Sequence, residues 1–99
     1  MYANMRRYKM EPASVDELKR RVEEGFISIV GDVPGFLAYY FVRAGEGEIV
    51  SINIFEDQAG AEKSAGEAAD WVEKNIPSLV PAGPEITSGE VIMHVHKLG

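Results

Sequence analysis

Two neighbouring apolar segments constrain the fold of this chain more than any other feature. They are residues 36–42 (FLAYYFV) and 49–55 (IVSINIF), and the glycine-rich stretch 44–48 between them is typical of a hairpin loop. Their β-branched and aromatic residues favour strands, and apolar side chains fall on both faces of the sheet that they would form. The chain has sequence for only two helices, which can cover one face. We therefore expect the other face to meet a second copy of the protein, in an obligate homodimer.

The flanking segments supply a short strand at residues 2–10, two helices and a last strand at residues 85–96. Ser14 and Glu17 have the spacing of a capping box at the start of the first helix. That helix would bury an apolar stripe formed by Val15, Leu18, Val22, Phe26 and Ile29. Asp57 is expected to cap the second helix, which is rich in alanine and ends at Pro77.

The order strand, helix, strand, strand, helix, strand predicts an α+β fold of the ferredoxin-like kind, with an antiparallel four-stranded sheet. The length of 99 residues, with 45% hydrophobic and 26% charged residues, is ordinary for one globular unit. No linker or low-complexity stretch divides it. We expect a single domain over residues 1–99.

The composition also narrows the location and the partners. The chain contains no cysteine, which excludes disulfides and thiolate metal sites and is compatible with a reducing compartment. No apolar run is long enough to span a bilayer, and the first residues lack the apolar core of a signal peptide, so we expect a cytoplasmic protein without a membrane partner. The net charge of -6 disfavours a nucleic-acid partner. The basic cluster Lys19 to Arg21 is interleaved with glutamates and is expected to form a solvated helix face.

Several local features resemble a known family. Pro34-Gly35-Phe36 at the entry of a strand, Phe55-Glu56-Asp57 at the opening of an alanine-rich helix, and the whole order of elements resemble the antibiotic biosynthesis monooxygenase-like family of the dimeric α/β-barrel superfamily. The resemblance covers almost the full chain. It implies that two sheets pack face to face across a dimer axis, with the helices outside. Members of that superfamily include cofactor-free oxygenases of polycyclic aromatics, haem-degrading enzymes and lactone isomerases.

Alternation along the strands separates a uniformly apolar face from a mixed one. We assign the apolar face to the helices, and it comprises Ala3, Met5, Val50, Ile52, Ile54, Val91, Met93 and Val95. The mixed face combines apolar residues with Asn4, Arg6, Tyr8, Ser51, Asn53, His94 and His96. A few polar groups on an otherwise apolar surface are typical of a small-molecule pocket, so we expect the site on this face.

His94 is the best candidate for a catalytic acid or base, because an imidazole titrates near neutral pH. The alternative is a histidine that only forms a hydrogen bond in the dimer core. His94 and His96 alternate on one strand and could place two nitrogens on a metal ion, but a zinc or iron site needs further ligands that are not obviously supplied. We therefore expect no metal site and no cofactor.

Five further residues are candidates for binding a substrate, and they are Asn4, Arg6, Tyr39, Asn53 and Trp71. Asn4 and Trp71 resemble, in residue type and element, groups used by the haem-degrading branch of the superfamily. That branch carries its haem-ligating histidine on or beside the second helix, whereas residues 57–84 of this chain contain no histidine. Arg6 could neutralise an anionic ligand, although pairing with an acidic side chain of the protein is the simpler expectation.

A tyrosine could donate a hydrogen bond to a phenolic or quinone-like substrate. Tyr39 and Tyr40 are adjacent on one strand, so they must point to opposite faces of the sheet. The sequence does not fix the register of the hairpin, and with it which of the two faces the pocket.

Three functions remain open at this point. The first is a cofactor-independent monooxygenase or related enzyme that acts on a small aromatic or quinone-like compound, with His94 as the base and Asn4, Arg6 and Asn53 orienting the substrate. The second is a non-catalytic dimer that binds a small ligand or is associated with stress. The third is a haem-binding or haem-degrading protein. The family resemblance favours the first, and whether the chain is an enzyme is not decided by its sequence.

Overall fold

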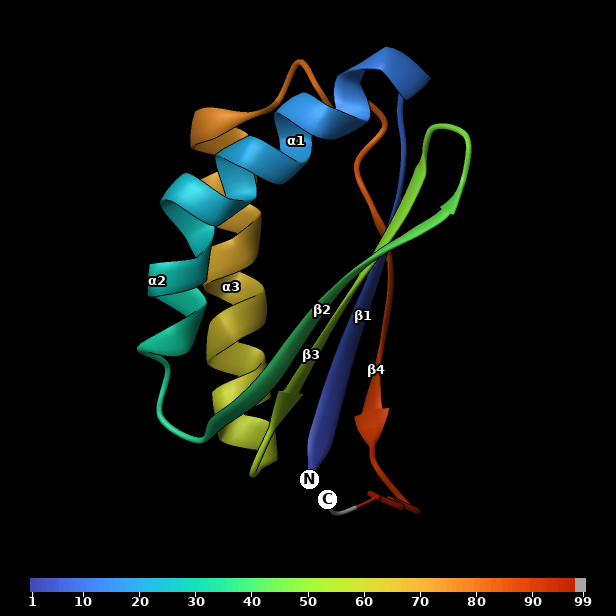
Figure 1. Cartoon of the computed structure of the whole chain (residues 1–99). Helices are drawn as coiled ribbons and strands as arrows, with labels where there is room; N and C mark the ends of the chain where they lie inside the picture. The colour runs from blue at the N-terminus through green and yellow to red at the C-terminus, as the bar shows by residue number, and fades with distance from the viewer. Residues whose placement is uncertain (98–99) are drawn as a thin grey trace.

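A computed structural model describes residues 1–97 and contains a four-stranded antiparallel sheet with helices on one face (Figure 1). The elements are β1 (Tyr2–Lys9), α1 (Val15–Arg21), α2 (Ile27–Gly31), β2 (Phe36–Gly45), β3 (Glu48–Phe55), α3 (Gln58–Asn75) and β4 (Glu85–Glu90). The strands are ordered β2-β3-β1-β4, so β1 lies between β3 and β4. This is the predicted ferredoxin-like α+β fold, with the helices on the same side of the sheet.

The first helical segment is interrupted by a π-helical turn at Val22–Phe26, which separates α1 from α2. A π turn contains an extra residue, so it rotates the following residues relative to an unbroken α-helix. The predicted stripe is confirmed at Val15, Leu18, Val22 and Phe26, which are buried, but Val30 replaces Ile29 as the next core residue. The periodicity of the sequence cannot reveal this one-residue shift.

The two predicted helix caps have different outcomes. Asp57 caps α3, where its Oδ1 accepts a hydrogen bond from the backbone N–H of Gly60 at 2.9 Å. The capping box at Ser14 is wrong, because a 3₁₀ turn over Pro12–Ser14 precedes α1 and leaves Ser14 in a helical conformation without a side-chain cap. The carboxylate of Glu17 instead pairs with the guanidinium groups of Arg20 and Arg21 on the exposed helix face.

The assignment of faces to the helices was also wrong. The helices cover the mixed face, where Asn4, Arg6 and Asn53 are 4%, 5% and 2% exposed. The uniformly apolar face is open, with Met5 39% and Tyr40 56% exposed. Both faces of the central strands carry apolar side chains, so counting them does not identify the helix-covered side. Hydrogen bonds to α3 distinguish the two faces. On the mixed face, Asn4 donates to the carbonyl of Ala61 and Asn53 donates to the hydroxyl of Ser64, and both partners belong to α3.

The last strand is shorter than predicted. Tyr2 of β1 pairs with Glu90, and the backbone N–H of Val91 donates to the carbonyl of Met1 at 2.9 Å, after which β1 offers no further partner. The chain therefore leaves the sheet, and the side chains of Ile92, Met93 and Val95 are 81–91% exposed. In Figure 1 this segment turns away below β4, beside the N-terminus.

The hairpin between β2 and β3 depends on a glycine. Gly47 has a φ of +68°, and a Cβ atom at this position would lie 2.2 Å from the carbonyl oxygen of Met10. The backbone N–H of Met10 also donates to the carbonyl of Gly47 at 2.8 Å, which ties the end of β1 to the hairpin.

No helix within residues 1–97 is long and apolar enough to cross a membrane.

Candidate functional site

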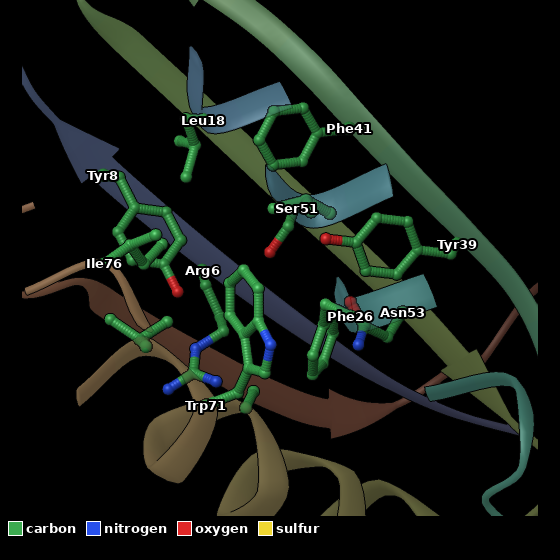
Figure 2. A pocket seen from close by; sticks show the side chains of 13 residues that line it. Arg6, Tyr8, Leu18, Phe26, Tyr39, Phe41, Ser51, Asn53, Trp71 and Ile76 are labelled. Atoms are coloured by element: carbon green, nitrogen blue, oxygen red, sulfur yellow. The ribbon is translucent and has the colours of Figure 1, made fainter. Parts of the chain in front are cut away.

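A small cavity lies between the sheet and the helices, and Figure 2 shows the side chains around it. Most of its wall is apolar and aromatic, with contributions from Leu18, Phe26, Phe41 and Trp71, and its polar members are Arg6, Tyr8, Tyr39, Ser51 and Asn53. We call it the inner cavity. Its volume of about 30 Å³ suits about two water molecules. It is a pocket of mixed composition, as the sequence predicted for this face.

A second space begins on the far side of Arg6. This outer cleft has a volume of about 260 Å³, opens to solvent, and lies between the end of α3 and the loop at residues 77–84. Arg6, Tyr8 and Val72 line both the inner cavity and the outer cleft. These side chains therefore separate the inner cavity, which has room for a few polar atoms, from the outer cleft, which has room for a ring.

Arg6 is the most unusual residue of the site. It is 5% exposed, and its Nε and Nη1 atoms are buried without a hydrogen-bond partner. The predicted pairing with an acidic side chain is wrong for residues 1–97, where Arg6 forms no ion pair within 4.0 Å. The ion pairs among the described residues lie at the surface instead, as in the pair that neighbouring Arg7 forms with Glu48.

Tyr39, rather than Tyr40, faces the inner cavity. A bulge between Phe36 and Ala38 fixes the register of the hairpin so that Tyr39 pairs with Asn53. Burial, followed by the neighbouring Tyr8, raises the pKa of Tyr39, while its hydrogen bond with Ser51 and the charge of Arg6 oppose the rise. Burial also raises the pKa of Tyr8, again against the charge of Arg6. Both phenols are therefore hydrogen-bond donors at neutral pH.

Asn53 lies on β3 at the other end of the inner cavity. Its Nδ2 donates to the hydroxyl of Ser64 on α3 at 3.4 Å, and its Oδ1 is buried without a partner. An unpartnered amide oxygen is an acceptor, whereas the unpartnered atoms of Arg6 are donors. The site can thus hold a ligand that both accepts and donates hydrogen bonds.

Trp71 on α3 closes the inner cavity from the helix side. Its ring lies 5.5 Å from that of Phe26, which belongs to the π-helical turn. A Cβ atom at Gly25 would approach the indole to 3.1 Å, so the absence of a side chain at Gly25 lets Trp71 pack directly against this turn. Irregular turns of this kind are frequent at functional sites.

Asn4 does not line the inner cavity. Its Nδ2 donates to the carbonyl of Ala61 on α3 at 2.8 Å, and its Oδ1 accepts from the hydroxyl of Ser88 on β4 at 2.8 Å. Both ends of the amide are therefore used to hold α3 and β4 against β1. The sequence predicted a substrate contact here, and the structure places the residue beside the site instead of in it.

His94 is also separate from the inner cavity. The sequence placed it on the mixed face with Asn4 and Asn53, which is wrong for the described residues because β4 ends at Glu90. The rings of His94 and His96 stack 6.0 Å apart, and both line a groove of about 490 Å³ on the open face of the sheet, with Leu37 and Tyr40. Within residues 1–97, no group of three or more histidine, aspartate or glutamate side chains could hold a metal ion.

Sequence reasoning missed the contribution of the first helical segment to the site. Phe26 and Val22 were expected only as core residues, yet they line the inner cavity. The signal that could have located them is Gly25, a glycine within a helical pattern, which costs helix stability and so indicates a close approach by another group.

Comparison with known proteins agrees with the fold. The sequence model of the antibiotic biosynthesis monooxygenase family matches residues 1–72, which is most of the chain. The chain belongs to the antibiotic biosynthesis monooxygenase family. The match includes β1, the first helical segment, the hairpin and most of α3, which together carry the polar residues of the inner cavity. No curated protein matches the sequence.

Solved structures share the fold of this family member at low sequence identity. A protein of unknown function from Nitrosomonas europaea is 18% identical, with a TM-score of 0.80 over 99% of this chain and 95% of that one. A monooxygenase from the gene ActVA-Orf6 of Streptomyces coelicolor, in complex with nanaomycin D, is 16% identical, with a TM-score of 0.78 over 98% and 92%. A point mutant of MhuD, with two manganese protoporphyrin IX molecules bound per active site, is 17% identical, with a TM-score of 0.76 over 98% and 100%.

Proposed function

We propose that this chain is a cofactor-independent monooxygenase, or a closely related enzyme, that acts on a small aromatic or quinone-like compound. One observation carries the proposal: unpartnered polar atoms of Arg6 and Asn53 and the phenol of Tyr39 converge on a pocket with otherwise apolar and aromatic walls. Membership of the family and the similar fold of a monooxygenase with nanaomycin D support the same class of reaction.

Oxygen chemistry without a metal or flavin requires that the substrate supply the electrons. In a monooxygenation of this kind, the substrate loses two hydrogens from its ring system and gains one oxygen atom of O₂, and the second oxygen atom leaves as water with those two hydrogens. The protein then contributes orientation, stabilisation of the substrate anion and exclusion of bulk water. Arg6 supplies the positive charge for the anion, while Tyr39 and Asn53 supply hydrogen bonds to the polar atoms of the substrate that reach the inner cavity, and these bonds orient a ring held on the other side of Arg6.

The residues that line the inner cavity include no histidine or carboxylate. A general base is therefore not provided by the side chains on its wall, and His94 is not used in this proposal. The positive charge of Arg6 lowers the pKa of a bound hydroxyl or carbon acid, so the substrate can lose its proton to water as it binds.

Oxygen uptake tests the proposal directly. The purified protein is mixed with monocyclic and bicyclic hydroquinones and with anthrone, and oxygen consumption is recorded against a reaction without protein. We expect an enzyme-dependent rate that falls at least about tenfold in Asn53→Ala, since a contact made in the transition state is lost. Tyr40→Phe, a change on the open face beside Tyr39, is the matched control and should keep the rate.

Binding without oxygen uptake for any of these compounds would contradict catalysis. That outcome would favour the second function, a non-catalytic protein that captures a small ligand in the same site. A filled, rigid cavity with neither binding nor turnover would contradict both.

We also propose that the open face of the sheet packs against a second copy of the chain. The side chains on this face are apolar in the centre, with Leu37 47%, Val42 42% and Met5 39% exposed, whereas charged residues such as Arg7 and Glu48 occupy one end. Contiguous apolar surface of this kind is typical of an interface. Light scattering should give twice the chain mass of 10.9 kDa, and a monomer at micromolar concentration would contradict the proposal.

A further inference from the structure

Arg6 carries a positive charge that nothing in the described part of the chain neutralises. Its side chain is 5% exposed, its Nε and Nη1 atoms have no partner, and no carboxylate of residues 1–97 lies within ion-pair distance. A buried charge without a partner is costly, because it loses its hydration without gaining a compensating bond. The chain has a net charge of -6, so acidic side chains are plentiful, yet within residues 1–97 this arginine pairs with none of them.

The spaces around Arg6 indicate which kind of group can bind its unpartnered guanidinium. The inner cavity has room for about two water molecules, which can hydrate the guanidinium while the site is empty. The outer cleft of about 260 Å³ is bounded by Tyr8, Val72, Val80 and prolines of the loop at residues 77–84, and it suits a single ring. In Figure 2 the guanidinium lies beside Trp71 and below the phenol of Tyr8.

We infer that Arg6 binds the anionic oxygen of an aromatic ligand, either a carboxylate or an ionised hydroxyl, whose ring lies in the outer cleft against Tyr8 and Val72. The inference deepens the proposed function by naming the charge state of its substrate, and it relies on that function only for the choice of an aromatic ring. Glu73 at the mouth of the outer cleft is the one acidic side chain that lines it within the described residues, and it disfavours anions modestly without pairing with Arg6.

Ligand pairs that differ in charge test this assignment in the unmodified protein. Sodium benzoate is compared with benzamide, which has the same ring and no charge, and with acetate, which has the charge and no ring. The chain contains a single tryptophan, so the indole N–H resonance of Trp71 in ¹H–¹⁵N spectra reports binding at this site. A third arm uses 4-nitrophenol, titrated at a pH below and at a pH above its own pKa, to compare an ionised hydroxyl with the carboxylate.

We expect benzoate or 4-nitrophenolate to bind roughly ten- to a hundredfold more tightly than its neutral counterpart, the factor that a charge-assisted hydrogen bond supplies. Arg6→Met, which keeps the length of the side chain and removes its charge, should abolish this preference. Arg7→Met is the matched control, because Arg7 is the next residue on β1, points to the opposite face and pairs with Glu48. It should keep the preference.

Equal affinity for the charged and neutral members of both pairs would overturn the inference, as would no shift of the Trp71 resonance with either anion at millimolar concentration. Should Arg6→Met fail to fold, Arg6→Lys takes its place and is expected to weaken the preference without removing it. A preference for the anion without any oxygen uptake supports this inference and contradicts the proposed catalysis, so the two failures are distinguishable.

Discussion

The amide of Asn4 should stabilise the fold rather than contact a ligand, and the substitution Asn4→Ala tests this. The side chain is 4% exposed and forms hydrogen bonds of 2.8 Å to both Ala61 and Ser88. A net contribution of about 1 kcal/mol for each bond gives a loss of about 2 kcal/mol in the free energy of unfolding. For a chain of this size that corresponds to a decrease of roughly 10 °C in melting temperature.

The loss of stability in Asn4→Ala comes mainly from the missing bonds of Asn4, because its two partners can form other hydrogen bonds. The Ala61 carbonyl lies in α3, where it also accepts the helical bond from the N–H four residues later, and Ser88 is exposed to solvent. Ser88→Ala should cost about 1 to 3 kcal/mol, because it leaves the buried Oδ1 of Asn4 without its partner. The double mutant should show a coupling energy of about 1 kcal/mol between the two positions, since both singles break the same bond.

Urea unfolding followed by circular dichroism at one fixed chain concentration is the assay. The transition midpoint should fall while its slope stays unchanged, because the surface exposed on unfolding is the same. Affinity for benzoate, measured on the folded variant, should stay within a factor of two or so of the original, since Asn4 does not line the inner cavity. Unchanged stability with a large loss of ligand affinity would refute the reasoning and return Asn4 to the binding site.

Three further predictions concern the walls of the site. Gly25→Ala should destabilise the fold by about 1 to 3 kcal/mol and shift the Trp71 indole resonance, since the new methyl group would lie 3.1 Å from that ring, whereas Gly66→Ala on α3 meets no atom within 4 Å and should be neutral or stabilising. Tyr39 is held protonated by burial, so its contribution to stability is complete below about pH 10 and is lost as the pH rises above that; in urea melts against pH, Tyr39→Phe should make this decline shallower by up to about 1.4 kcal/mol per pH unit. Titration with haem should give no saturating shift of the Soret band, because neither histidine lines the inner cavity, and a saturating shift would revive the haem-binding function.

Most of the fold could be predicted from the sequence because local signals agree with one another. The segments 36–42 and 49–55, the loop with Gly47 and the cap at Asp57 each specify their own local structure, and the order of the elements then leaves few topologies. The π-helical turn could not be predicted, since Val22 and Phe26 are spaced as in an ordinary α-helix. The end of β4 could not be predicted either. It depends on where β1 begins, because β1 provides the hydrogen-bond partners of β4, and the identity of Val91 or His94 does not reveal this position.

The candidate site was predicted in composition but not in arrangement. Arg6, Asn53, Tyr39 and Trp71 do meet at one cavity, because alternation places polar residues of β1 and β3 on the same face. Asn4 shares that face, yet it lies one pleat further along β1, where α3 is close enough for its backbone to take the amide. A residue on this face lines the cavity only where the covering helix lies far enough from the sheet. The sequence pattern of a single strand gives no information about that distance.

The choice of the covered face shows why polar residues were the better guide to function. The uniformly apolar face has no polar groups to bury, yet the helices cover the mixed face, so that a charged arginine lies under the helices while Met5 and Tyr40 are left open. Such an arrangement is stable only if other contacts bury the exposed apolar side chains of the open face and compensate the charge of Arg6 on the helix-covered face. We propose that a second copy of the chain supplies the missing burial on the open face, and that a bound anion supplies the missing charge for Arg6 on the helix-covered face. Both proposals rest on the same reversal of faces, and a variant that removes the charge of Arg6 should stabilise the empty protein while it abolishes the preference for anions.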